Sequence, residues 1–406
     1  MRKMKDSGIE WIGKIPEEWK LCKPKYLGKI RSGDSITNNK LNDESGYEVF
    51  GGNGIIGYYY QYNTEGINII IGRVGALCGN VRIVDGKKFI SDNALIFTCV
   101  SDANVKYLYY LFEAFELNRL NTSNAQPLIT GFKVLNIVIP FPNLIEQQQI
   151  ASYLDARCAE IDATSEDIQK EINILEDYKK SLIYNAVSNG ITDKEYSYEC
   201  DEVWGTIPKG WRMVDIKYLF EIVKRIAGKE GYDVLSVTQK GLKIKDITSG
   251  DGQLADNYSG YQFVYPTDYV MNHMDLLTGW VDCSDLFGVT SPDYRVFRLR
   301  DKSVNNLAFY KYVMQCCYMN KIFYSLGQGV SNLGRWRLQT SSFNNFKVPV
   351  PPKAEQDEIA SYLDARCSEI DALIADKKKQ LELLAEYKKS LIYEYVTGKK
   401  EVPLHE

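Results

Sequence analysis

The stretch "IASYLDARCAEIDA" at residues 150–163 returns as "IASYLDARCSEIDA" at residues 359–372. The two copies differ at one position, where Ala159 in the first corresponds to Ser368 in the second. A second block, "YKKSLIY", follows at residues 178–184 and again at 387–393, with the same offset of 209 residues. Self-similarity at a fixed offset indicates a duplication. The chain is therefore predicted to contain two related halves.

The repeated stretch opens a heptad pattern that is typical of a long α-helix with a narrow apolar seam. Apolar residues recur at sevens: Leu154, Ile161, Ile168, Leu175 and Leu182 in the first half, and Leu363, Ile370, Leu384 and Leu391 in the second. Lys377 interrupts the second row once. Pro142 and Gly190 flank the first pattern, and Pro352 and Gly398 flank the second, as start and stop signals. We expect the two helices to pair as an antiparallel coiled coil. The alternative is that each helix covers only its own domain.

The segments between the helices diverge and are typical of α/β (α+β) globules. A shared lead-in, residues 11–19 and 203–211, precedes each one. Strand-like runs are expected at 67–71, 80–84, 94–100, 132–141, 294–299 and 346–350, a hairpin at Asp85 and Gly86, and short helices at 105–117 and 308–318. The predicted domains are 1–145 and 191–354 as globules with their lead-ins, 146–190 and 355–398 as long helices, and 399–406 as a tail.

The composition excludes several function classes. Hydrophobic residues make up 45% of the 406 and no apolar run approaches the ~18 residues needed to span a membrane, so we expect a cytoplasmic protein without a membrane anchor or a signal peptide. Nine cysteines without a C-x-x-C pair are typical of reduced thiols. His273 and His405 are the only histidines, so we expect no metal site and no histidine-based catalysis. With no P-loop and no convincing nuclease cluster, we expect a chain without catalytic residues.

The net charge of -4 conceals a division between globules and helices. Residues 20–145 carry 13 basic and 10 acidic side chains, and residues 212–354 carry 18 and 13. In contrast, residues 146–211 carry 6 basic and 14 acidic side chains, and residues 355–406 carry 8 and 12. Basic globules favour DNA, whereas acidic helices favour protein partners. Ordinary variation in surface charge is the alternative for either globule taken alone.

Three loop-like stretches, residues 54–63, 121–130 and 325–340, combine glycine with amide, basic and aromatic side chains. Asn and Gln pair with adenine edges and Arg with guanine. On this chemistry, the candidate DNA-reading residues are Asn53, Arg73, Thr122, Gln126, Gln328, Asn332, Arg335 and Arg337. The alternative is that these stretches are exposed loops with structural tyrosines.

The order of lead-in, globule and helix, given twice, resembles the specificity subunit of type I restriction-modification systems. The helical signature consists of Pro142, Glu146, Gln147, Ile150, Ala151, Tyr153, Leu154, Asp155, Ile161 and Asp162, and it recurs at Pro351, Glu355, Gln356, Ile359, Ala360, Tyr362, Leu363, Asp364, Ile370 and Asp371. The likeness covers essentially the whole chain. It is specific because the motif, its order and the duplication agree.

The resemblance implies two target-recognition domains, each reading one half of an asymmetric, bipartite double-stranded DNA target, with the helices setting the spacer. It also implies partners: two methyltransferase subunits docked on the helices, and restriction subunits around that core, in a system of host defence. S-adenosylmethionine, ATP and Mg would belong to those partners and not to this chain.

Two other function classes stay open at this point. A stand-alone DNA-binding regulator would also be basic and duplicated, but it would bind DNA without a methyltransferase. An enzyme fused to a coiled coil would transfer methyl groups by itself, which requires chemistry that the sequence does not display.

Overall fold

The computed structural model describes residues 2–75, 77–121, 127–191, 198–247, 255, 257–329 and 336–403. The chain forms two compact units. Unit 1 comprises Met1–Gln169 with Lys379–Glu406, and unit 2 comprises Lys170–Lys378. Because the division passes through both long helices, each unit combines one α/β globule with a piece of each helix.

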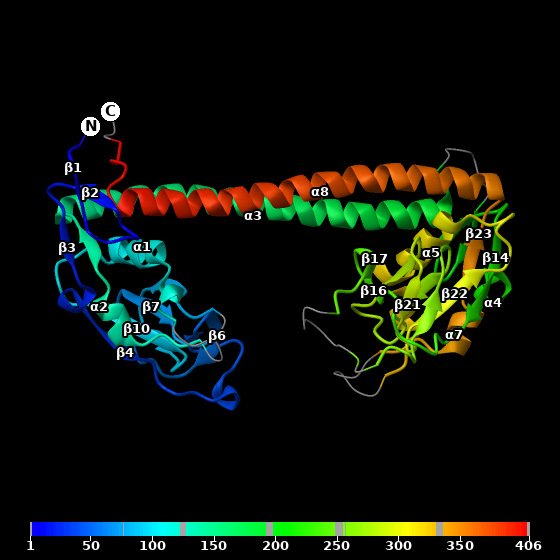
Figure 1. The fold of residues 1–406 in the computed structure, drawn as a ribbon, viewed down its shortest axis with the longest axis horizontal. Coiled ribbons are helices and arrows are strands. Elements are labelled where there is room, and N and C mark those ends of the chain that lie inside the picture. Colours follow the sequence, from blue (N-terminus) through cyan, green and yellow to red (C-terminus); the bar gives the residue numbers. More distant parts are fainter. Residues whose placement is uncertain are drawn as a thin grey trace. The chain divides into compact units, whose positions relative to one another are not determined.

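The globule of unit 1 is built on a four-stranded antiparallel sheet. The strand order is β4 (Gly28–Ser32), β10 (Ala94–Cys99), β7 (Asn68–Gly72), β8 (Val81–Val84). All five residues of β7 are buried, as expected for an inner strand covered on both faces. Helix α1 (Val105–Phe115) packs against this sheet (Figure 1). Phe112 of this helix meets Phe97 of β10 edge to face.

The globule of unit 2 repeats this arrangement with different side chains. Its sheet has the order β15 (Phe220–Val223), β22 (Arg295–Leu299), β19 (Tyr269–Met271), β20 (Val281–Cys283), again antiparallel throughout. Helix α5 (Leu307–Met319) takes the place of α1. Both helices start at an asparagine, Asn104 or Asn306, whose side chain accepts a hydrogen bond from the backbone N–H three residues later. The two globules therefore share one fold.

Shorter elements complete each unit. In unit 1 they are β1 (Met4–Asp6), β2 (Lys14–Pro16), β3 (Lys20–Cys22), η1 (Pro24–Tyr26), η2 (Asn38–Lys40), β5 (Tyr47–Gly51), β6 (Gly54–Tyr59), β9 (Phe89–Ile90), η3 (Leu117–Leu120), α2 (Gly131–Asn136) and β11 (Ile139–Phe141). In unit 2 they are β12 (Tyr198–Asp201), β13 (Gly205–Pro208), β14 (Arg212–Asp215), α4 (Ile216–Leu219), β16 (Leu235–Thr238), β17 (Gly241–Ile244), β18 (Gln262–Val264), β21 (Gly288–Thr290), α6 (Ile322–Ser325), α7 (Thr340–Asn345) and β23 (Lys347–Val350).

The two long helices are α3 (Leu144–Asn189) and α8 (Lys353–Val396), of 46 and 44 residues. Each is followed closely by a glycine with positive φ, Gly190 at 80° and Gly398 at 70°, a conformation that suits glycine and ends a helix. Every predicted seam position is buried or half-buried: Leu154, Ile161, Ile168, Leu175, Leu182, Leu363, Ile370, Leu384 and Leu391. Among the described residues, no helix is both long and apolar enough to cross a membrane.

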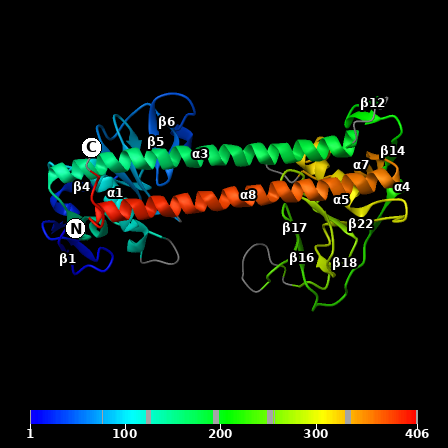
Figure 2. The ribbon, with the colours of Figure 1, turned by 90° about the horizontal axis from the view of Figure 1, so that it is seen from above.

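Pieces of α3 and α8 run alongside each other in opposite directions within each unit (Figure 1, Figure 2). In unit 1, Lys388 Nζ lies 2.7 Å from Asp162 Oδ1. In unit 2, Lys179 Nζ lies 2.6 Å from Asp371 Oδ1. The second ion pair is the duplicate of the first, because each of its residues is 209 positions from its counterpart.

Two local predictions are wrong. The strand predicted over residues 132–141 begins as helix α2, because Thr130 caps that helix by accepting a hydrogen bond from Lys133 N, and only β11 at its end is extended. The hairpin predicted at Asp85 and Gly86 is a turn, with Gly86 at φ 79°, but the strands on either side of it pair elsewhere. Strand β8 pairs with β7, whereas β9 pairs with β5.

Candidate nucleic-acid interface

Asn53 lies in the turn between β5 and β6 of unit 1, with its side chain exposed. Its Oδ1 accepts a hydrogen bond from Asn80 Nδ2 at 3.0 Å, and its backbone O accepts one from Arg82 Nη2 at 2.8 Å. The adjacent Ile55 and Ile56 are 51% and 47% exposed. The turn therefore presents an amide beside two apolar side chains, a combination suited to contact with base edges.

Arg73 directly follows β7, at one end of the sheet of unit 1. It is half-buried, and its Nη1 donates to Ser32 Oγ at 3.1 Å. Its backbone N donates to Asn93 O, and its backbone O accepts from Ile129 N, both at 2.9 Å. These contacts hold Arg73 where β4, β7 and the segment before α2 meet.

Gln328 and Arg337 of unit 2 face each other across an isolated β-bridge, with backbone N···O distances of 2.9 and 3.1 Å. The Gln328 side chain is exposed. The guanidinium of Arg337 instead turns inward, because its Nε lies 2.7 Å from Met274 Sδ. Trp336 beside it stacks on Tyr324 and donates to the Tyr324 backbone O at 2.6 Å. These contacts hold Gln328 and Arg337 side by side, with the Gln328 side chain exposed and the Arg337 guanidinium packed against Met274.

Four predicted readers, Thr122, Gln126, Asn332 and Arg335, lie outside the described residues. The segments that follow them occupy equivalent places in the two units. Ile129 N donates to Arg73 O at 2.9 Å in unit 1, and Leu338 N donates to His273 O at 3.0 Å in unit 2. Arg73 therefore lies at one end of the sheet of unit 1, and Gln328 and Arg337 lie near the corresponding end of the sheet of unit 2. Asn53 belongs to the separate β5–β6 hairpin.

A cluster of basic groups in unit 2, His273, Arg295 and Arg337, went partly unrecognised in the sequence. Arg295 is 4% exposed, its Nη2 donates to Leu338 O at 3.1 Å, and burial lowers its pKa to about 10. Burial, with the charges of Arg295 and Arg337, lowers the pKa of His273 to about 4. No carboxylate of the described residues forms an ion pair with any of the three. The sequence contains one indication of this cluster: Arg295 begins the β22 run "RVFRL", directly before two apolar residues.

The signature glutamine of each long helix joins that helix to its globule. Gln147 is 1% exposed, its Oε1 accepts from Asn104 N at 2.9 Å, and its Nε2 donates to Pro142 O at 2.9 Å. Gln356 repeats both contacts in unit 2, at 2.8 and 2.9 Å. Each glutamine thus satisfies two buried backbone groups that would otherwise be costly. The signature glutamine therefore makes the same structural joint in both halves of the chain.

The signature aspartate makes a second link at each joint. Tyr110 OH donates to Asp155 Oδ1 at 2.8 Å in unit 1, and Tyr312 OH donates to Asp364 Oδ1 at 2.7 Å in unit 2. Burial first, and then the neighbouring carboxylate, raises the pKa of both tyrosines. Both phenols therefore stay protonated and act as donors, which fixes the rotation of each globule helix against its long helix.

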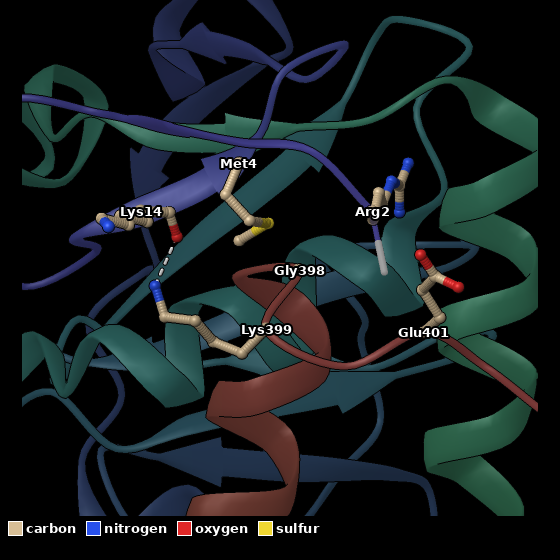
Figure 3. A pocket seen from close by; sticks show the side chains of 6 residues that line it. All are labelled: Arg2, Met4, Lys14, Gly398, Lys399 and Glu401. Atoms are coloured by element: carbon tan, nitrogen blue, oxygen red, sulfur yellow. Dashed lines mark hydrogen bonds between the residues drawn. The ribbon is translucent and has the colours of Figure 1, made fainter.

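In unit 1 the N-terminal segment and the tail after α8 line an open pocket of about 660 Å³ (Figure 3). Lys399 Nζ donates to Ile12 O at 2.6 Å and to the backbone O of Lys14, on the side of the pocket opposite Arg2. Burial lowers the pKa of Lys399. Arg2 itself binds Glu146 of α3, with Nη1 2.5 Å from Oε1. Both cations already have protein acceptors, so we interpret this pocket as a structural joint.

The long helices carry apolar side chains that the seam does not use. Ile174 and Tyr178 of α3 are 67% and 47% exposed, and Leu383 and Tyr387 of α8 are 55% and 48% exposed. Each pair is four residues apart, so its members share a helix face. The two pairs are also equivalent, since 209 positions separate each residue from its counterpart. A partner present in two copies would meet the same chemistry on both helices.

The family model for the type I restriction modification DNA specificity domain matches residues 16–173 and 208–383, once for each half of the chain. The chain belongs to this family. It is 26% identical to the putative type I restriction enzyme MjaX specificity subunit of Methanocaldococcus jannaschii, over 96% of each protein. It is 33% identical to the type I restriction enzyme EcoprrI specificity subunit of Escherichia coli, over 33% of this chain and only 35% of that protein.

The fold agrees with family membership. A chain from a solved structure on complex assembly and conformational transition of the type I restriction-modification system superposes with a TM-score of 0.65, at 14% identity. The superposition covers 95% of this specificity-family chain and 99% of the other. Tandem α/β globules, each followed by a long helix, are therefore the shared architecture.

Proposed function

We propose that this chain is the DNA-reading subunit of a type I restriction-modification complex and has no catalytic role of its own. Each globule would read one half of an asymmetric, bipartite target. The observation that carries the proposal is that one sheet order occurs twice with different side chains at the corresponding sheet ends, Arg73 in unit 1 and His273 with Arg295 in unit 2. Two globules with the same fold but different side chains at the sheet end suit two different half-sites.

The charge distribution supports DNA as the ligand of the globules. Both globules carry more basic than acidic side chains, and Arg337 of unit 2, which is partly exposed, has no acidic partner among the described residues, so a phosphate backbone would offset part of this charge. The predicted readers Asn53, Arg73, Thr122, Gln126, Gln328, Asn332, Arg335 and Arg337 remain our candidates, and Gln328 and Asn53 are the described ones whose side chains are exposed.

We further propose that α3 and α8 form an antiparallel coiled coil that sets the distance between the half-sites. The duplicated ion pairs Lys388–Asp162 and Lys179–Asp371 support this pairing. The equivalent exposed pairs, with Ile174 in α3 and Leu383 in α8, would each dock one methyltransferase subunit. Restriction subunits would join this core in the cytoplasm. S-adenosylmethionine, ATP and Mg would come with the partners.

The deciding experiment is co-expression of the chain with the methyltransferase encoded beside it, followed by sequencing of methylated adenines in the host DNA. We expect one asymmetric motif with two specified parts and a fixed unread spacer. Gln328→Ala is expected to relax only the half read by unit 2, and Asn53→Ala only the half read by unit 1. A palindromic motif, or no new methylation with any partner, would contradict the proposal.

DNA binding by the purified chain distinguishes the proposed subunit from a stand-alone DNA-binding regulator. Such a protein would bind its site tightly without a methyltransferase, whereas we expect strong sequence-specific binding only from the assembled complex. Gel-shift titrations with and without the methyltransferase measure this difference.

A further inference from the structure

The middle segments of α3 and α8 differ in charge, although other parts of the two helices are identical. Residues 166–176 of α3 carry four acidic side chains and one basic side chain. The counterpart segment of α8, residues 375–385, carries three basic and two acidic side chains. On either side of these segments, the blocks "IASYLDAR" and "YKKSLIY" are the same in both helices. The likeness between the two helices is therefore lost in their middle segments.

Two ion pairs join the middle segments in unit 2. Lys377 Nζ of α8 pairs with Glu171 Oε2 of α3, and Lys378 Nζ lies 3.5 Å from Glu176 Oε1. Lys377 is the residue that interrupts the apolar seam, and its side chain is only 27% exposed. A partly buried charge is costly unless an opposite charge meets it. Glu171 therefore compensates for the lysine in the seam.

The counterpart positions in unit 1, each 209 residues away, cannot form these ion pairs. The counterparts of Lys377, Lys378, Glu171 and Glu176 are, in that order, Ile168, Gln169, Gln380 and Ala385. None of these four residues carries a charge. Two ion pairs of unit 2 are thus excluded from unit 1 by composition, whereas the outer pairs Lys388–Asp162 and Lys179–Asp371 occur once in each unit.

A duplicated helix has more than one possible partner. Two copies of the chain could pair α3 with α3, or α8 with α8, in the same antiparallel register. The outer ion pairs do not oppose this, because Asp162 would then face Lys179 of the other copy, and Asp371 would face Lys388. The outer pairs are therefore equally available to like and to unlike helices.

The middle segments distinguish between these pairings. Between two α8 helices, Lys377 would face Gln380 and would stay in the seam without a carboxylate. Between two α3 helices, Glu171 would face Ile168. Each like pairing also brings together two segments with an excess of the same charge. A polar residue in a seam and repulsion between like charges both select one helix partner by penalising the others.

We propose that the Lys377–Glu171 and Lys378–Glu176 pairs make each long helix select the unlike helix, so that α3 pairs with α8 and not with α3 of a second copy. The consequence for DNA reading rests on the proposed function. Pairing of unlike helices places one globule of each kind in every complex, which suits a target with two different half-sites. Pairing of like helices would bring two identical globules together, which suits a palindromic target.

A variant with the two middle segments made alike tests the selection in the full-length chain. Its four substitutions copy the counterpart residues: Glu171→Gln, Glu176→Ala, Lys377→Ile and Lys378→Gln. Two differently tagged copies are mixed, and native mass spectrometry measures the fraction of mixed dimers. We expect this fraction to rise about tenfold over that of the unchanged chain. The melting temperature should not fall, because Ile suits a seam position better than Lys.

The matched control carries Asp162→Asn with Asp371→Asn. It also loses two ion pairs, but it loses them equally from like and unlike pairings, so its fraction of mixed dimers should stay as in the unchanged chain. Exchanging the charges, with Glu171→Lys and Lys377→Glu, should also leave the fraction unchanged, because the ion pair is kept in reverse.

Methylation mapping with the methyltransferase adds a functional measurement. Beside the asymmetric motif, we expect the variant with like middle segments to produce two palindromic motifs, each built from one half-site and its inverted copy. A rise in dimers without palindromic motifs would mean that unlike helices were exchanged, and it would overturn the inference.

The outcomes separate this inference from the proposed function. If the unchanged chain produces no methylation with any partner, the proposed function fails, and the dimer measurements still decide the pairing. If the unchanged chain methylates an asymmetric motif, the proposed function stands. An unchanged dimer fraction in the variant with like middle segments, or an equal rise in the control, then overturns the inference alone.

Discussion

His273 is held neutral by its surroundings in unit 2. Burial and the guanidinium groups of Arg295 and Arg337 lower its pKa to about 4, from an ordinary value of 6.5. Between these two values the unfolded chain binds a proton that the folded chain does not. The stability of unit 2 should therefore rise with pH from about 4 to about 6.5, and this contribution is lost as the pH falls through that range.

The His273→Gln variant tests this at the residue scale. When the pH falls from 6.5 to 5, the free energy of unfolding should decrease more for the wild-type chain than for the variant. The difference should be about 1 kcal/mol once solvent screening of the partly exposed ring is allowed for. Urea denaturation at several pH values measures the difference, and carboxylates that titrate in both proteins cancel. Parallel pH profiles for the two proteins would contradict the argument.

At the scale of elements, α8 offers two leucines of opposite surroundings within unit 2. Leu363, a seam position, is fully buried in the globule core, whereas Leu373 is 53% exposed. We expect Leu363→Ala to cost about 2–5 kcal/mol of unfolding free energy, through lost burial and the cavity that remains. Leu373→Ala should change stability by no more than about 0.5 kcal/mol. Both variants replace Leu by Ala in one helix, so helix propensity does not separate them.

Chemical denaturation of the two variants checks this prediction. Similar losses for both would mean that the heptad pattern does not identify the packed face of α8. A large loss for Leu373→Ala alone would mean that the face is the opposite one.

At the scale of the whole molecule, the proposed coiled coil makes the helices a ruler. Inserting one turn of four residues into both α3 and α8 adds about 6 Å, at ~1.5 Å per residue. This corresponds to about two base pairs of DNA, at ~3.4 Å each. We expect the methylated motif to keep both half-sites and to gain spacer length. Mapping methylated adenines measures it, and a changed half-site with an unchanged spacer would contradict the ruler.

Elements marked by local sequence signals were predicted well. The long helices were predictable to within about two residues, because a heptad period and flanking Pro and Gly residues are local signals. Strand β7 and helix α1 were also close to their predicted ranges. Helix α2 was missed because its start depends on a cap at Thr130 inside an apolar run that is equally typical of a strand.

The candidate interface was predicted less completely, for a physical reason. Residue type marked Arg337 as a base reader, but only packing decides that its guanidinium lies against Met274. Arg295 gave a weak signal, because a charged residue in a strand is ordinary unless its burial is known.

The sequence by itself determined the duplication, the helical seam, the charge division and, through the repeated signature, the family. These features depend on order and spacing along the chain. Only the tertiary structure shows that Gln147 and Gln356, just ahead of the two copies of "IASYLDAR", tie each long helix to its globule, and that Arg295 is buried. Hydrogen-bond satisfaction and burial depend on neighbours far apart in the chain, which periodicity does not specify.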